Sequence, residues 1–172
     1  MKQTPSSDRF IVHLGTANKE TVLPRLADLG HVEEISDSDE MFLLRIEEGT
    51  SDAKEIWERA RDVVGPDGFV EPVLYDERGN PHYPTGEVSV RFYEPLSDEQ
   101  LRRFAADNRL RLRNRNEFVP EQAVFTPLTP DEIYIPDLLE RIANSEVAKI
   151  VWANTLSRFQ RARGTAKDLK AV

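Results

Sequence analysis

The feature that most constrains the fold of this chain is an internal repeat of secondary-structure signals. Apolar and polar residues alternate at 10–14 and again at 88–92, which is typical of half-buried strands. Each segment is followed by a polar turn and then by an apolar stripe at helical spacing, over 19–29 and over 97–108. The same elements in the same order predict two related units.

The rest of each copy follows one plan as well. A hairpin, a helix and a closing strand are predicted in each, at 31–46, 53–64 and 69–75 in the first copy and at 109–127, 138–142 and 147–153 in the second. Each copy therefore has the element order βαββαβ.

This order is that of the ferredoxin-like plan. We predict an α+β fold of two tandem ferredoxin-like units, with antiparallel sheets and helices on one face. The segment DERGNPHYPTG at 76–86 is rich in Gly, Pro, Asn and Asp, which favours a boundary. The predicted parts are a first unit at 1–79, a linker at 80–86, a second unit at 87–160 and a flexible tail at 161–172.

Charge and composition limit the classes of partner. The formal net charge of -8 works against binding to nucleic acid or to anionic membranes. Without cysteine, the chain has no disulfide, no thiolate metal site and no cysteine nucleophile. Because residues 1–15 lack the apolar run of a signal peptide, and no stretch resembles a membrane span, we expect a cytoplasmic protein.

Three short motifs carry a resemblance to a known family. They are GFVEPVLYDERG at 68–79, PTGEVSVRF at 84–92 and RNEFVPEQAVF at 115–125. Together they resemble the tandem N-terminal prodomain (propeptide) of subtilisin-like serine proteases of the fervidolysin kind, without the catalytic domain. The resemblance covers nearly the whole chain. The second unit departs from the pattern, because it closes as VAKIVWANTLS at 147–157 without a Glu-Pro pair.

The resemblance implies a role in trans. Such prodomains pack a sheet face against their protease, assist its folding and lay a C-terminal segment along the active-site cleft. This implies six candidate cleft-binding residues: Asn154, Thr155, Leu156, Ser157, Arg158 and Phe159. In a competing interpretation, this segment forms a short helix that covers the second unit.

Two further features are candidate protein contacts. Arg109, Arg111 and Arg113 alternate with leucines, so their guanidinium groups should share the solvent face of one strand. They could dock an acidic partner, or they could protect the strand from edge pairing. Trp152, near the end of the second unit, could anchor a partner or could pack inside the protein.

The sequence predicts no catalytic, cofactor or metal site. His13, His31 and His82 lack partners at metal-ligand spacing. The motifs of the subtilisin triad and of a glycine-rich phosphate loop do not occur. We therefore expect a protein that is not an enzyme, uses no cofactor and binds another protein, with its oligomeric state open.

Three functions are compatible with these observations. The first is a prodomain-like module that binds and inhibits or chaperones a subtilisin-like or other protease in trans. The second is an adaptor or regulatory subunit of a multi-component system that kept the prodomain fold. The third is a small-molecule sensor with its ligand at the lobe interface.

Overall fold

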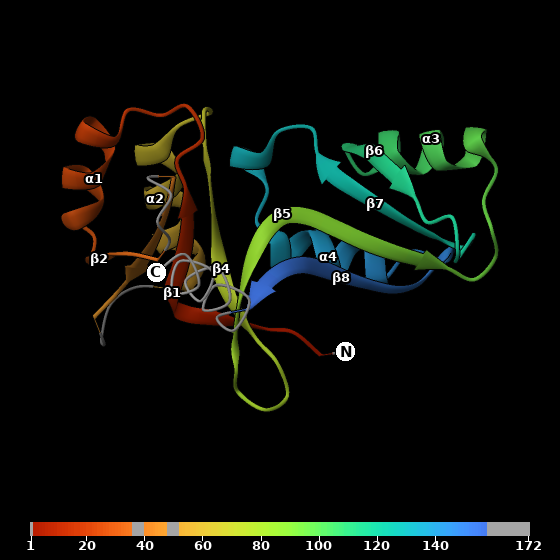
Figure 1. Cartoon of the computed structure of the whole chain (residues 1–172), viewed down its shortest axis with the longest axis horizontal. Helices are drawn as coiled ribbons and strands as arrows, with labels where there is room; N and C mark the ends of the chain where they lie inside the picture. The colour runs from red at the N-terminus through yellow and green to blue at the C-terminus, as the bar shows by residue number, and fades with distance from the viewer. Residues whose placement is uncertain (1, 36–39, 48–51, 158–172) are drawn as a thin grey trace, which may run out of the picture. The chain divides into compact units, whose positions relative to one another are not determined.

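The computed structural model describes residues 2–35, 40–47 and 52–157 (Figure 1). Over these residues it has four α-helices and one eight-stranded antiparallel sheet, so the predicted mixed α+β class is confirmed. The elements in chain order are β1 (Thr4–His13), α1 (Lys19–Ala27), β2 (His31–Glu34), β3 (Met41–Arg45), α2 (Ala53–Val64), β4 (Phe69–Tyr75), β5 (Pro81–Phe92), α3 (Asp98–Asp107), β6 (Leu110–Arg115), β7 (Gln122–Pro127), a 3-10 turn (Pro130–Glu132), α4 (Ile135–Ala143) and β8 (Ala148–Ser157).

The chain divides into two compact units. Unit 1 contains the residues up to Thr85 and the end of β8 from Thr155, and unit 2 contains Gly86–Asn154. The segment 80–86, expected as a linker, is mostly part of β5. Its prolines do not end the strand because their fixed φ suits an extended backbone, and Gly86 takes a positive φ of 91° that a glycine tolerates.

Two helices cover one face of the sheet in unit 1. The strand order there is β2-β3-β1-β4. Helix α2 contacts β1 and β4 and also packs against α1. Trp57 of α2 is buried, and its indole Nε1 donates a hydrogen bond of 2.6 Å to the carbonyl oxygen of Val70 in β4. This bond fixes the helix to the strand at the centre of the unit.

The other face of this sheet is apolar too. Ile11, Leu43, Val73 and Tyr83 form a buried cluster on it. Strand β1 therefore buries Phe10 toward the helices as well as Ile11 on the opposite side. The half-buried strand that simple alternation predicts is instead a strand buried on both faces.

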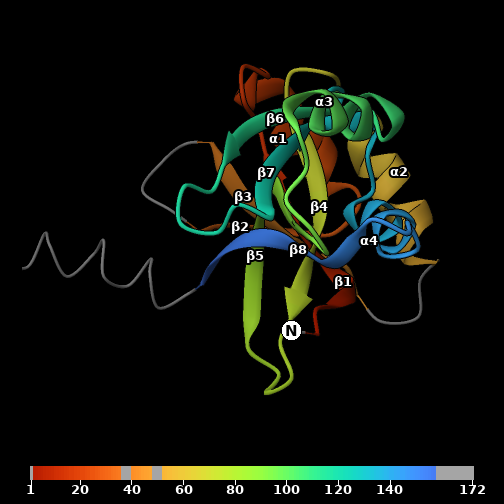
Figure 2. The same cartoon turned by 90° about the vertical axis from the view of Figure 1, so that its right-hand side faces the viewer.

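In unit 2, α3 and α4 lie on the same side of the sheet (Figure 2). Phe104 of α3 packs edge-to-face on Phe92 of β5, with ring centroids 5.0 Å apart, and also contacts Phe125 of β7. Arg141 of α4 donates a hydrogen bond of 3.0 Å to the carbonyl oxygen of Asn108, which caps α3. The strand order is β8-β5-β7-β6.

His13 should make the stability of unit 1 depend on pH. Its ring stacks on Phe69, with centroids 4.2 Å apart, and its Nε2 lies 3.0 Å from the carbonyl oxygen of Pro84. Burial disfavours the imidazolium and lowers the pKa of His13 below its ordinary value of 6.5. The unfolded chain therefore binds this proton at a higher pH than the folded chain does.

We expect the free energy of unfolding to fall as the pH drops below about 6.5, because protonation then favours the unfolded chain. Urea unfolding at about pH 7.5 and about pH 5.5 measures this loss. The loss should be smaller in His13→Gln, whereas the exposed His31→Gln should behave like the wild type. An unchanged pH dependence in His13→Gln would show that another group is responsible.

Candidate protein-binding site

The face of the unit 2 sheet that α3 and α4 leave uncovered, here called the helix-free face, carries a polar network. The Ser89 hydroxyl donates to Asn154 Oδ1 at 2.7 Å, and Asn154 Nδ2 donates to Glu87 Oε2 at 3.5 Å. Glu87 Oε1 lies 3.9 Å from Nε of Arg113. Because β7 lies between β5 and β6, the Arg113 side chain reaches across it. The network thus links β8, β5 and β6.

A second pair on β5 and β7 is ordered in the same way. Arg91 and Gln122 are directly opposite each other in the strand register, and Arg91 Nη2 donates to Gln122 Oε1 at 2.9 Å. Arg91 Nε is buried and has no hydrogen-bond partner among the described residues. A donor without an acceptor costs free energy. The pair therefore keeps hydrogen-bonding capacity that the described residues do not use.

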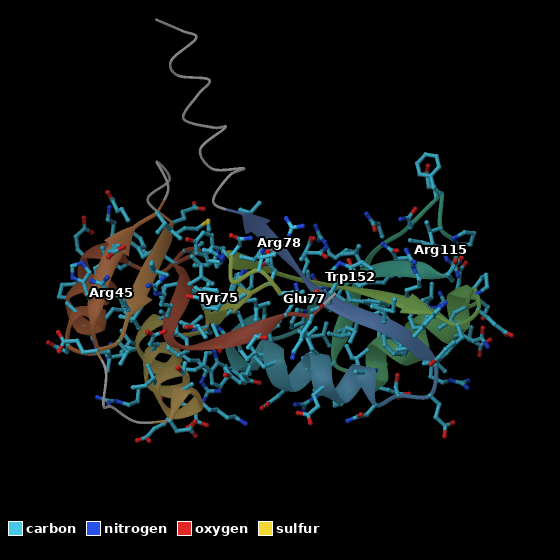
Figure 3. All side chains as sticks on the ribbon, turned by 90° about the horizontal axis from the view of Figure 1, so that it is seen from below. Arg45, Tyr75, Glu77, Arg78, Arg115 and Trp152 are labelled. Carbon is cyan, nitrogen blue, oxygen red and sulfur yellow. The ribbon has the colours of Figure 1, made fainter. Side chains whose placement is uncertain are left out.

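Strand β8 adds apolar side chains to this face. Alternate residues of a strand share a face, which places Ile150 and Trp152 with Asn154. Trp152 is half-buried and Ile150 is 39% exposed; Figure 3 labels Trp152 on β8. At the opposite margin, Arg111 is exposed and has no ion pair within the described residues. The face therefore runs from an apolar margin at β8 to a basic margin at β6.

The three arginines predicted to share one face are not equivalent. Arg109 precedes β6 in a left-handed conformation, with φ of 55°. A bulge between Leu112 and Asn114 then interrupts the alternation at Arg113, which pairs with Glu87 instead of standing free. The sequence indicates the basic charge of this edge but not the turn and bulge that separate its members.

The predicted cleft-binding segment begins as part of the sheet. The members that lie in the described part of the chain all continue β8: Asn154, Thr155, Leu156 and Ser157. Asn154 belongs to the polar network, and Leu156 is exposed. The short-helix interpretation does not apply to these four residues. Arg158, Phe159 and the expected tail at 161–172 lie outside the described residues.

The β4–β5 hairpin of unit 1 holds a carboxylate–imidazole pair. Asp76 Oδ2 lies 3.0 Å from His82 Nε2, and Asp76 Oδ1 accepts hydrogen bonds from the backbone N–H groups of Arg78 and Asn80. The bond to His82, followed by those of the turn, lowers the pKa of Asp76 well below its ordinary value. His82 Nδ1 lies 3.5 Å from Thr155 Oγ1. We assign this group to the structure of the hairpin and to holding the end of β8.

A separate surface feature lies at the tip of the β6–β7 hairpin, where Phe118 is 92% exposed. Asn116 Oδ1 accepts hydrogen bonds from the backbone N–H groups of Phe118 and Val119, which orders the loop. A hollow of about 550 Å³ lies beside it, lined by Pro95, Leu96, Arg115, Asn116, Glu117 and Pro120. Sequence reasoning missed Phe118; an aromatic residue inside a polar hairpin turn is the signal that could have found it.

Neither a metal-binding cluster nor a membrane-spanning helix occurs in residues 2–35, 40–47 and 52–157. These residues contain no group of three or more His, Asp or Glu side chains that could hold a metal ion. None of their helices is long and apolar enough to cross a membrane.

Comparison with known proteins adds no relative. No family model matches the chain, and no curated protein matches its sequence. The fold and this surface therefore define the chain as an α+β protein whose sheet has one face without helices, and side chains on that face are hydrogen-bonded to one another.

Loss of the Ser89–Asn154 hydrogen bond should reduce stability. Ser89 is only 3% exposed, so Asn154→Ala removes the acceptor of a buried hydroxyl. We expect the free energy of unfolding to fall by about 1–3 kcal/mol, and by about 0.5–1.5 kcal/mol for Ser89→Ala, which removes the donor itself. Urea unfolding of both variants and of the double variant gives the coupling energy. Equal costs of Asn154→Ala with and without Ser89 would rule the coupling out.

Proposed function

We propose that this chain is a non-catalytic protein-binding module that docks its partner on the helix-free face of unit 2. The observation that carries the proposal is that Arg and polar side chains on this face are already held by hydrogen bonds and an ion pair of their own chain, beside the half-buried Trp152. Ordered side chains lose little conformational entropy on binding. Trp and Arg are also the residue types that most often dominate binding energy.

We further propose that both units are ferredoxin-like. Numbered within each unit, the strand orders β2-β3-β1-β4 and β6-β7-β5-β8 are the same. In each unit one helix follows the first strand and another follows the third, which is the βαββαβ plan. Two consecutive units with one strand order favour an origin by duplication.

The partner class we propose is a subtilisin-like or other protease supplied by a separate chain, which the module would inhibit or chaperone. Two observations support it. The first two motifs that resemble the prodomain family lie where one unit closes and the next begins, because residues 68–79 include β4 and residues 84–92 lie in β5. A prodomain of that family docks by a sheet face, and unit 2 has such a face with one apolar and one basic margin.

A panel of purified subtilisin-like proteases, including those of the native host, tests this proposal. The intact protein should slow hydrolysis of a peptide substrate by at least one of them. Trp152→Ala should raise the inhibition constant at least about tenfold, because it removes the aromatic side chain at the apolar margin. Leu128→Ala is the matched control, since Leu128 is 51% exposed and follows β7, away from β8.

A chain that ends at Ser157 separates face docking from cleft occupation, because it keeps all of β8. Binding without inhibition would support a cleft role for the residues after Ser157. If Trp152→Ala inhibits as well as the wild type, the proposed face is wrong. If no protease responds, and a different purified host protein binds the wild type but not Trp152→Ala, the adaptor function replaces the inhibitor function.

A further inference from the structure

The β6–β7 hairpin and the loop between β5 and α3 meet at one end of unit 2. The backbone N–H of Phe92 donates a hydrogen bond of 2.7 Å to the carbonyl oxygen of Glu121, and Arg115 Nη1 donates one of 2.9 Å to Asp98 Oδ1. Figure 1 shows the end of β5 and this hairpin at the same end of the unit, and Figure 3 labels Arg115 where β6 ends. Two loops that are distant in the sequence therefore form one surface.

Phe118 projects from this surface on an ordered loop. Its side chain is 92% exposed, yet its backbone N–H and that of Val119 both donate to Asn116 Oδ1. The Asn116 N–H in turn donates a hydrogen bond of 2.9 Å to the carbonyl oxygen of Gln122. An exposed aromatic ring on an ordered loop offers apolar area to a partner, and the loop loses little conformational entropy on binding.

The hollow beside this ring has an apolar wall, to which Pro95, Leu96 and Pro120 contribute. Its volume of about 550 Å³ lies in the range of ligand sites in proteins. Of the six residues that line it, Arg115 is the only basic one, and the Asp98 carboxylate at 2.9 Å neutralises its charge. The hollow is therefore suited to the methylene stem of a long side chain.

Three glutamates, here called the acidic rim, border this hollow. Glu117 is one of the lining residues, and Glu94 and Glu121 are each next in sequence to a lining proline. None of the three has an ion pair within the described part of the chain. Surface charges without a counter-charge attract an oppositely charged partner and orient its approach. The acidic rim therefore favours a cationic partner.

Two other occupants fit this surface less well. A second copy of the chain would bring the same carboxylates against the acidic rim, and like charges repel. An anion is disfavoured by α3, which begins beside Leu96 of the hollow. Ser97 and Gln100 form a capping box that already uses N–H groups of this helix end. Asp98 and Glu99 add negative charge to its first turn.

We propose that this end of unit 2 binds an extended basic segment of a partner protein, with one arginine or lysine side chain in the hollow. The methylene stem of that side chain lies against Leu96 and the two prolines, and its charge meets the acidic rim. The face of the Phe118 ring attracts a neighbouring cation of the segment. This inference goes beyond the proposed function, because it uses neither Trp152 nor Asn154, so the two can fail separately.

Fluorescence anisotropy of the full chain with a labelled peptide of alternating arginine and leucine residues tests the inference. We expect saturable binding of this peptide, and none of a peptide in which glutamate replaces arginine. Phe118→Ala should weaken binding at least about tenfold, because it removes the exposed aromatic ring. Glu117→Gln should weaken binding about two- to fivefold, as is typical of one exposed ion pair.

Matched controls come from the other end of β7. Leu128 and Glu132 are exposed and follow that strand, away from the β6–β7 hairpin. Leu128→Ala and Glu132→Gln should therefore bind the peptide like the wild type. Nuclear magnetic resonance of the wild type gives the location, since the backbone amide shifts of 94–96 and 115–121 should change most when the peptide is added.

Three results would overturn the inference. The first is equal affinity of the wild type and Phe118→Ala, with thermal unfolding unchanged. The second is a set of amide shift changes centred on another part of the chain. The third is equally strong binding of the glutamate peptide, because the surface would then have no preference for a basic segment.

Discussion

The arrangement of both units depends on the burial of one sheet face beneath two helices. In unit 2, Val88 and Val90 are fully buried on the helix side, so the residue between them is held on the other face. That residue is Ser89, and its position brings the hydroxyl to Asn154. The order of the helix-free face thus comes from packing beneath it. The buried core therefore fixes the position of Ser89 in this network, and the hydrogen bond to Asn154 adds to that order.

Much of the secondary structure could be predicted from the sequence, because periodicity is a local property. The closing strand at 69–75 and the strand at 122–127 have the predicted bounds. Other strands extend beyond their apolar pattern. Strand β1 begins at Thr4, although the residues before Phe10 are mostly polar, because backbone pairing with β4 resumes at Pro5 beyond an irregularity in the register. Pairing of this kind depends on the partner strand, which local periodicity does not reveal.

The candidate site could be predicted only in part. Asn154 and Trp152 stand out in the sequence because they lie near the end of the second repeat. Ser89 and Glu87 do not, because a polar residue in an alternating strand looks like any solvated one. Their partners are separated from them by most of unit 2, and only the strand order brings them together. The arginines in the sequence show that this edge is basic, but the sequence does not show the bulge at Arg113.

The position of β8 has a consequence for biosynthesis. The main sheet of unit 1 consists of β1, β2, β3 and β4. These strands are consecutive in the chain, and the last of them ends at Tyr75. Unit 2 places β5 in the middle of its sheet, and one neighbour of β5 is β8, which comes after every other element. A nascent chain leaving the ribosome can therefore close the sheet of unit 1 early, while β5 waits with an unpaired edge until β8 emerges. The interval of greatest exposure to misassembly is the synthesis of residues 93–147.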